Sequence, residues 1–230
     1  MLLELIIFGL LLVLICAGFA TLFLRAFYYK SFTKALILKA AASICFVILG
    51  AISAFSGELS ATKLLIFIGL CFGIVGDEVI ALCQVFPKYD IQAFIGGGSF
   101  FFVGHVLYII ALLLLGDTSW LTLIAAFLIA STISAAYTKR KGSLIPEMKT
   151  TLTLYLSVVV FVAATAMGAF FGRFTLGTGL FAVGGLLFAA SDNILFAYKF
   201  GEKPQFVQNV LLHVFYYSAQ LLIAWSIAYL

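Results

Sequence analysis

The stretch LLFAASDNILFAYKF, residues Leu186 to Phe200, decides what kind of fold this chain adopts. It has the length and apolarity of a membrane span, yet Ser191, Asp192 and Asn193 lie in its middle. An ionised carboxylate inside a bilayer is costly unless a partner compensates for its charge, and such acids are functional by default. The stretch therefore predicts a membrane helix that carries a paired or functional aspartate.

The rest of the chain has the composition of an integral membrane protein. Of its 230 residues 65% are hydrophobic and 10% are charged, and the mean hydropathy is +1.24. These values exclude a soluble domain. Many apolar runs approach the length of about 20 residues that a helix needs to cross a hydrocarbon core of about 30 Å. The alternation of a barrel strand is missing from the sequence, so the predicted fold is an all-α membrane protein.

We predict eight transmembrane helices in a single transmembrane domain, 1–230. The predicted spans are 2–24, 35–55, 63–86, 97–116, 119–138, 150–170, 175–199 and 206–229. The first is expected to be a retained span, because it is too long for the apolar core of a signal peptide and lacks a basic start. The fourth is expected to begin only at Gly96–Gly98, because three glycines disfavour a helix interior and suit an interfacial loop.

The basic residues predict the orientation of these spans. Ten of the 13 Lys and Arg residues lie in loops on one side of the predicted membrane: Arg25, Lys30, Lys34, Lys88, Lys139, Arg140, Lys141, Lys149, Lys199 and Lys203. Only Lys63 and Arg173 lie on the other side, and Lys39 falls inside the second span. The positive-inside rule then places both termini outside. We expect a multi-pass protein of a bacterial cytoplasmic membrane, with no nucleic-acid partner because the net charge of +4 comes from span ends.

Two similar stretches suggest an internal repeat. HVLYIIALLL begins at His105 and HVFYYSAQLL begins at His213, and each closes a group of four predicted spans. We interpret them as an ancient duplication with halves 1–116 and 117–230. Because each half has four spans, the halves would run parallel, related by a pseudo-twofold axis along the membrane normal. Chance similarity between apolar segments is the alternative.

The buried acids fit the same repeat. Asp77 and Asp192 lie about 15 Å and about 10 Å from the cytoplasmic ends of their predicted helices, at 1.5 Å per residue. Lys39 and Tyr155 precede these two aspartates by 38 and 37 residues. We therefore expect the polar groups of the two halves to meet around one axis. Lys39 either takes part in this site or extends its ammonium to the headgroups.

Further polar residues surround the aspartates in the sequence and are expected to support them. A polar stripe in the last span has helical spacing and consists of Asn209, His213, Tyr216, Tyr217 and Gln220. The supporting candidates are Glu78, His105, Ser191, Asn193 and His213. Both histidines are read more readily as hydrogen-bonded core residues than as metal ligands. The four cysteines show no metal-site or CxxC spacing, and we expect them to be free.

A carboxylate pair is the simplest active arrangement that these residues allow. No HxxxH or HxxE element indicates a metal site, and nothing resembling GxSxG surrounds Ser191. Two acids in unlike environments can divide the work of a general acid, which keeps its proton, and a general base, which stays ionised. Glycosidases use this division to cleave through an oxocarbenium-like state.

Four motifs in order resemble the YhhN-like lysoplasmalogenase family. They are GLCFGIVGDEVIAL (69–82), GHVLYIIAL (104–112), LLFAASDNILFAYKF (186–200) and FYYSAQLLIAW (215–225), and the resemblance covers nearly the whole chain. One departure is visible, because Lys39 is followed by Ala40 where the family usually has proline. The resemblance implies a hydrolase that cleaves the vinyl ether of lysoplasmalogens into a fatty aldehyde and glycerophosphocholine or glycerophosphoethanolamine.

The resemblance also implies roles for individual residues. Asp77 and Asp192 match the acidic motifs and are the expected catalytic pair, without an assignment of acid and base. The expected substrate-binding residues are Lys39, for the phosphate, and Tyr108, Tyr155, Tyr217 and Gln220. No cofactor or metal is expected, the substrate is a lysophospholipid, and its chain would lie between spans, reached from the inner leaflet. The oligomeric state is left open.

Two other function classes suit the same residues. Parallel repeats with intramembrane carboxylates also occur in proton-coupled transporters. A protein that binds lysolipid without turnover is the second alternative. Uptake without breakdown of the solute would indicate the first, and binding without breakdown the second.

Overall fold

The structure of the chain, a computed structural model, describes residues 2–116, 119–141, 149–201 and 205–230. These residues form eight long α-helices and contain no β-strand. The long helices are α1 (Leu2–Tyr28), α2 (Phe32–Phe55), α3 (Ala61–Val85), α4 (Asp90–Leu114), α5 (Trp120–Lys141), α6 (Lys149–Gly172), α7 (Leu176–Phe200) and α8 (Phe206–Ser226). Two short 3-10 helices, η1 (Pro87–Tyr89) and η3 (Ile227–Tyr229), precede α4 and follow α8. The predicted all-α fold is confirmed for this part of the chain.

Seven of the described helices are long and apolar enough to cross a membrane. An α-helix suits this environment because it satisfies its backbone hydrogen bonds internally. In α5 the apolar stretch Leu121–Thr132 is shorter than a span. The protein is therefore a multi-pass integral membrane protein, and the eighth span at 119–138 stays a prediction.

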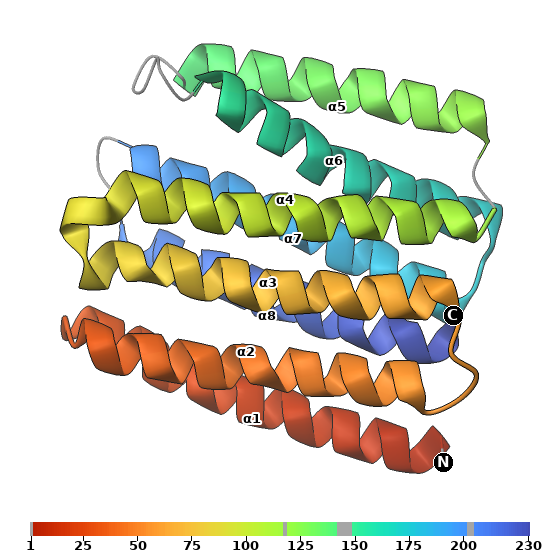
Figure 1. Cartoon of the computed structure of the whole chain (residues 1–230), viewed down its shortest axis with the longest axis horizontal. Coiled ribbons are helices and arrows are strands. Elements are labelled where there is room, and N and C mark those ends of the chain that lie inside the picture. The colour runs from red at the N-terminus through yellow and green to blue at the C-terminus, as the bar shows by residue number, and fades with distance from the viewer. Residues whose placement is uncertain (1, 117–118, 142–148, 202–204) are drawn as a thin grey trace.

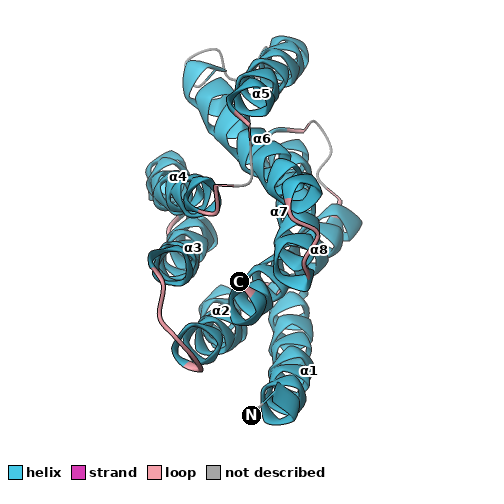
Figure 2. Cartoon of the chain, turned by 90° about the vertical axis from the view of Figure 1, so that its right-hand side faces the viewer, coloured by secondary structure: helices cyan, strands magenta, loops and turns pink. Residues whose placement is uncertain are grey.

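Six helices form a closed ring when the bundle is viewed from one end (Figure 2). Around the ring α2 contacts α3, α3 contacts α4, and α4 contacts α6. The ring continues from α6 to α7, from α7 to α8, and from α8 back to α2. Outside it, α1 packs against α2 and α8, and α5 packs against α6. The ring brings α2, α3, α7 and α8, which carry most of the predicted polar residues, around one interior.

The helix contacts follow the order that a duplication predicts. The neighbours α1–α2, α2–α3 and α3–α4 of the first half recur as α5–α6, α6–α7 and α7–α8. Between the halves, α8 packs on α2, and α4 packs on α6. A twofold relation requires this pair of contacts, because it exchanges α2 with α6 and α4 with α8. Two helices depart from the pattern in the described residues: α1 and α3 also contact α8, whereas their counterparts α5 and α7 have no matching contact with α4. The halves 1–116 and 117–230 stay a prediction.

Both ends of the described chain lie at the same end of the bundle (Figure 1). The last residues of α1, α3 and α7 lie together at the opposite end. That opposite end carries Lys30, Lys88 and Lys199. The sequence prediction that this end faces the cytoplasm stays a prediction.

The start of α4 corrects one sequence prediction. Gly96–Gly98 were expected in a loop, but α4 begins at Asp90 and runs through all three glycines. A Cβ at Gly97 would lie 2.5 Å from Cγ1 of Ile80 and 2.6 Å from the carbonyl oxygen of Gly76. Glycine therefore allows α3 and α4 to approach closely, and this packing outweighs its weak helix propensity.

The ends of the helices and the cysteines agree with ordinary local rules. The Ser60 hydroxyl caps α3 by accepting from the Lys63 amide at 3.3 Å. Thr175 and Thr178 form a reciprocal capping box that starts α7, with hydrogen bonds of 3.2 and 3.3 Å. The four cysteines are free, as expected, and three of them are buried.

Candidate functional site

Asp77, on α3, is held by two donors from α2. The Lys39 Nζ lies 2.5 Å from Asp77 Oδ1 and also donates to the main-chain oxygen of Asp77 at 2.8 Å. The Ser43 hydroxyl donates to Asp77 Oδ2 at 2.8 Å. Lys39 and Ser43 are four residues apart and therefore share one face of α2. All three residues are buried, so Lys39 does not extend to the headgroups. A buried carboxylate with a cation and a further donor is suited to remain ionised.

Asp192, on α7, has a different environment. The Tyr155 hydroxyl, from α6, donates to Asp192 Oδ2 at 2.7 Å. Asp192 is 4% exposed and forms no ion pair with any described residue. For a buried carboxyl group without a cation, the neutral acid is the less costly form. The two aspartates thus differ in the charge of their partners.

The neighbours of the aspartates have mainly local roles. The Ser191 hydroxyl donates to the Phe188 carbonyl at 2.9 Å, and the Asn193 amide donates to the Ala189 carbonyl at 2.7 Å. Both bonds remain within α7, so neither side chain holds Asp192. Glu78 was expected to support the aspartates. Its Oε1 is buried without a hydrogen-bond partner in the described structure.

The two predicted histidines make the same contact in the two halves. His105 Nδ1 lies 2.6 Å from the Phe101 carbonyl, and His213 Nδ1 lies 2.7 Å from the Asn209 carbonyl. A carbonyl oxygen only accepts, so Nδ1 is the donor in each ring and Nε2 is the nitrogen left for another partner. His105 packs edge-on against Phe188, at 4.7 Å between ring centroids. This supports the reading of both residues as hydrogen-bonded core histidines.

A chain of long hydrogen bonds connects the predicted tyrosines and Gln220. The Tyr108 hydroxyl donates to Gln220 Oε1 at 3.5 Å, and Gln220 Nε2 donates to the Tyr216 oxygen at 3.4 Å. The Tyr217 hydroxyl donates to the Lys39 carbonyl at 3.4 Å. All are buried, and their distances are at the weak end of the range for hydrogen bonds. These bonds link a side chain of α4 and the backbone of α2 to side chains of α8.

Asp77 and Asp192 line one small cavity at the end of the bundle that carries the basic turns. The cavity encloses about 70 Å³, which exceeds the roughly 30 Å³ that one water occupies in the liquid. Its polar lining consists of Lys39, Asp77, Gln84, Ser191, Asp192, Tyr198, Lys199, Asn209, His213 and Tyr216. We call it the acid cavity. The carboxyl groups of the two halves therefore face a shared space that has room for water.

The other predicted site residues lie outside the walls of the acid cavity. They are Glu78, His105, Tyr108, Tyr155, Asn193, Tyr217 and Gln220. Tyr155 still reaches the site through its bond to Asp192. Tyr108 and Gln220 bond to each other in the interhelical network.

Three residues of this region escaped the sequence prediction of the site. Ser43 has no motif around it, and only its i+4 spacing from Lys39 could have indicated its role. Lys199, counted in the sequence only among the basic residues that predict orientation, donates to the carboxylate of Asp90 and lines the acid cavity. The third is Asn209, considered only as part of the polar stripe. It is 2% exposed, and its Nδ2 has no hydrogen-bond partner in the described structure.

The described residues contain no group of three or more His, Cys, Asp or Glu side chains that could hold a metal ion. The acid cavity brings together carboxylates, lysines and hydroxyl groups. They can donate a proton, accept a proton and orient water.

The protein is therefore a helical membrane bundle in which two aspartates from different helices line one cavity. The sequence profile of the YhhN family matches residues 34–227. The chain belongs to the YhhN family, which confirms the family resemblance found in its motifs. No curated protein and no solved structure matches it.

Proposed function

We propose that the protein hydrolyses the vinyl ether bond of lysoplasmalogens to a fatty aldehyde and glycerophosphocholine or glycerophosphoethanolamine. The observation that carries the proposal is that two buried carboxyl groups with unlike partners line one cavity. Membership of the YhhN family supports it, because the resemblance that implied this activity is to that family. The site would open toward the cytoplasmic leaflet of a bacterial membrane.

Asp192 is proposed as the general acid. Hydrolysis of a vinyl ether begins when a proton is added to the β-carbon, which leaves an oxocarbenium ion at the α-carbon. Proton transfer to carbon is the slow step, so a carboxylic acid that keeps its proton is valuable there. Asp192, which has the Tyr155 hydroxyl and no cation beside it, fits this role.

Asp77 is proposed as the carboxylate that stabilises the cation and then accepts a proton. Its negative charge favours the oxocarbenium ion across the cavity. As water adds to the α-carbon, Asp77 accepts one of its protons and a hemiacetal forms. When the hemiacetal collapses, its hydroxyl proton returns to Asp192 and the proton on Asp77 moves to the departing glyceryl oxygen. One water is consumed, and both carboxyl groups regain their starting states.

The remaining predicted residues are proposed to position these groups or the substrate. Lys39, expected from the sequence to bind phosphate, is engaged by Asp77 in the structure, and we assign it to holding that carboxylate ionised. Tyr155 orients Asp192. The choline or ethanolamine headgroup would lie toward the tyrosines that line the acid cavity, because tyrosine rings attract ammonium groups. Tyr108, Tyr217 and Gln220 would act mainly by fixing α8.

The test is turnover of a defined lysoplasmalogen by the purified protein in heavy water. The proposal expects one deuterium on the carbon next to the aldehyde, because the acid adds a solvent-derived proton to the β-carbon. A saturated alkyl-ether lysophospholipid, the matched control, should remain intact. Solute uptake into proteoliposomes without lipid breakdown would overturn the proposal in favour of transport. Binding of the lysoplasmalogen without breakdown would overturn it in favour of a lipid-binding protein.

A further inference from the structure

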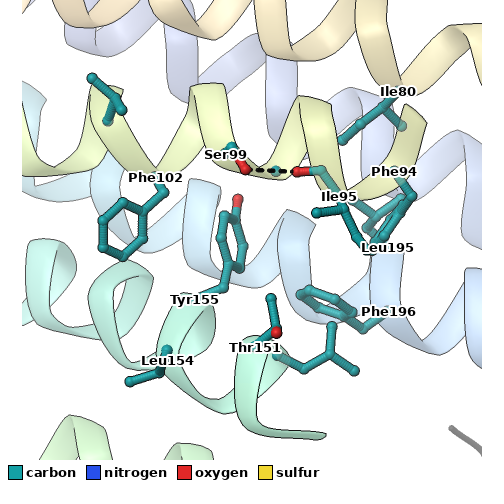
Figure 3. A pocket seen from close by; sticks show the side chains of 13 residues that line it. Ile80, Phe94, Ile95, Ser99, Phe102, Thr151, Leu154, Tyr155, Leu195 and Phe196 are labelled. Carbon is teal, nitrogen blue, oxygen red and sulfur yellow. Dashed lines mark hydrogen bonds between the residues drawn. The ribbon is translucent and has the colours of Figure 1, made fainter. Parts of the chain in front are cut away.

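A second cavity, of about 330 Å³, lies between α4 and α6 (Figure 3). Its walls are almost entirely apolar and include Phe94, Ile95, Phe102, Val103, Leu154 and Tyr155. The Ser99 hydroxyl in its wall donates to the Ile95 carbonyl within α4, so it presents no unsatisfied donor (Figure 3). We call this cavity the α4–α6 groove.

The α4–α6 groove adjoins the acid cavity. Ile80, Phe94 and Leu195 line both spaces. Tyr155 provides the direct chemical connection, because its ring lines the groove while its hydroxyl donates to Asp192. A molecule in the groove would therefore lie against the residue that holds the proposed general acid.

The length of the groove matches one leaflet of a membrane. Along α4 it extends from Phe94 to Val103, which is about 14 Å at 1.5 Å per residue. Half of a hydrocarbon core of about 30 Å is about 15 Å. The Phe94 end lies nearer the turn between α3 and α4, and the Val103 end lies deeper in the helix. A chain lying along the groove would thus run in the direction of the lipid chains around it.

We propose that the α4–α6 groove binds the single hydrocarbon chain of the lysolipid substrate. The vinyl ether would lie at Tyr155, the chain would extend toward Phe102 and Val103, and the headgroup would lie toward Lys199. The proposal rests on the proposed function, because that function supplies a lipid with one chain. It adds the location of the chain and makes Tyr155 the contact between chain site and acid.

Gly98 offers a clean way to fill the groove. It lines the groove, and a Cβ built on it meets no atom within 4 Å, so Gly98→Phe adds bulk into open space. Gly18 on α1 is the matched control, because a Cβ there also meets nothing within 4 Å and Gly18 lines none of the cavities described above. The two variants make the same substitution at two helical positions where a Cβ has open space.

The first measurement is independent of turnover. A non-hydrolysable alkyl-ether lysophospholipid with a diazirine at the end of its chain is photolysed with the purified protein, and the labelled residues are mapped. The proposal expects labels on α4 and α6 around Phe102 and Val103, lost in Gly98→Phe and kept in Gly18→Phe. Labelling that is spread over the outer faces of the bundle, or unchanged in Gly98→Phe, would overturn the groove assignment even if the enzyme hydrolyses lysoplasmalogens.

The second measurement compares lysoplasmalogens with long and short chains. Gly98→Phe should lower the ratio of kcat/KM for the long chain to that for the short chain by about ten-fold, as expected when bulk in an apolar pocket excludes part of a chain. Gly18→Phe should leave the ratio unchanged. An unchanged ratio in Gly98→Phe contradicts the groove assignment. Absence of hydrolysis in the unsubstituted protein contradicts the proposed function instead, and the photolabelling then still decides whether the groove binds a lipid chain.

Discussion

Asp77 on α3 and Asp192 on α7 occupy places that correspond in the two predicted halves, and they differ in their partners. The partner of Asp77 is Lys39, a cation 38 residues before it, and the partner of Asp192 is Tyr155, a neutral hydroxyl 37 residues before it. Ser43 adds a second side-chain donor on the first side only. The first carboxylate is thus surrounded by groups that favour its charge, and the second is not.

This contrast suggests how a duplication can build an acid–base site. Two identical halves would place two equivalent acids around one axis, whereas acid–base catalysis needs one protonated and one ionised group. A difference in one partner residue, a lysine beside Asp77 and a tyrosine beside Asp192, can give the two acids different protonation states. In the predicted duplication, His105 and His213 would be a pair whose contacts stayed alike, because each ring bonds the carbonyl four residues before it.

Asp77→Asn is the substitution with the largest expected effect, because it changes both activity and stability. It leaves the buried Lys39 ammonium without its counter-ion, and breaking a buried pair in this way costs about 3–5 kcal/mol. Aldehyde release should also fall about 1,000-fold, within the range for loss of a general base. Thermal unfolding in detergent and a lysoplasmalogen assay measure the two effects.

The double variant Lys39→Met/Asp77→Asn tests the cause of that instability. Removal of both charges should recover much of the lost stability without restoring activity, because the penalty arises from an unpaired charge. If the losses of the two single variants simply add, Lys39 and Asp77 are not coupled and the assignment of Lys39 is wrong.

Asp192→Asn is expected to lose activity alone. Asparagine keeps an oxygen that accepts from the Tyr155 hydroxyl, and no described cation is left unpaired. Aldehyde release should fall about 1,000-fold while the unfolding temperature changes little. Near-normal turnover in this variant would remove Asp192 from the mechanism and with it the contrast between the halves.

Gly97→Ala tests the packing that positions Asp77 on α3. The added Cβ would lie 2.6 Å from the Gly76 carbonyl, immediately before Asp77, so the helices must separate, at a cost of about 1–3 kcal/mol. Gly98→Ala is the neighbouring control. Its Cβ meets nothing within 4 Å, and alanine is the better helix former by about 1 kcal/mol. The two variants should therefore shift the unfolding temperature in opposite directions, and shifts of the same sign would contradict the close α3–α4 contact.

Tyr155→Phe should have the smallest effect of this series. It removes one hydrogen bond to Asp192, worth about 0.5–1.5 kcal/mol when neither partner is charged, or up to about ten-fold in rate. Measured kcat for lysoplasmalogen hydrolysis checks this value. A loss as large as that of Asp192→Asn would show that Tyr155 itself transfers the proton.

Much of the fold and several polar residues of the site were predictable from one-dimensional patterns. Apolar runs of span length marked seven helices now found to be long and apolar enough to cross a membrane, and the expense of charge in a bilayer marked Asp77, Asp192 and Lys39. The predicted start of the fourth span at Gly96–Gly98 was wrong. Helix propensity is a local property, whereas the close contact of α4 with α3 depends on tertiary packing. Ser43 and Asn209 carry no pattern that separates them from other small polar residues in helices.

By itself, the sequence determined that the chain is helical, that it lies in a membrane and that the costly aspartates Asp77 and Asp192 lie within two of its spans. These properties follow from hydropathy and spacing, which act along the chain. Only the tertiary structure decided that Lys39 is bound to Asp77, that Tyr155 is bound to Asp192 and that both carboxyl groups line one cavity. Such pairings depend on how helices far apart in sequence approach one another. The contrast between the two acids is therefore a product of packing.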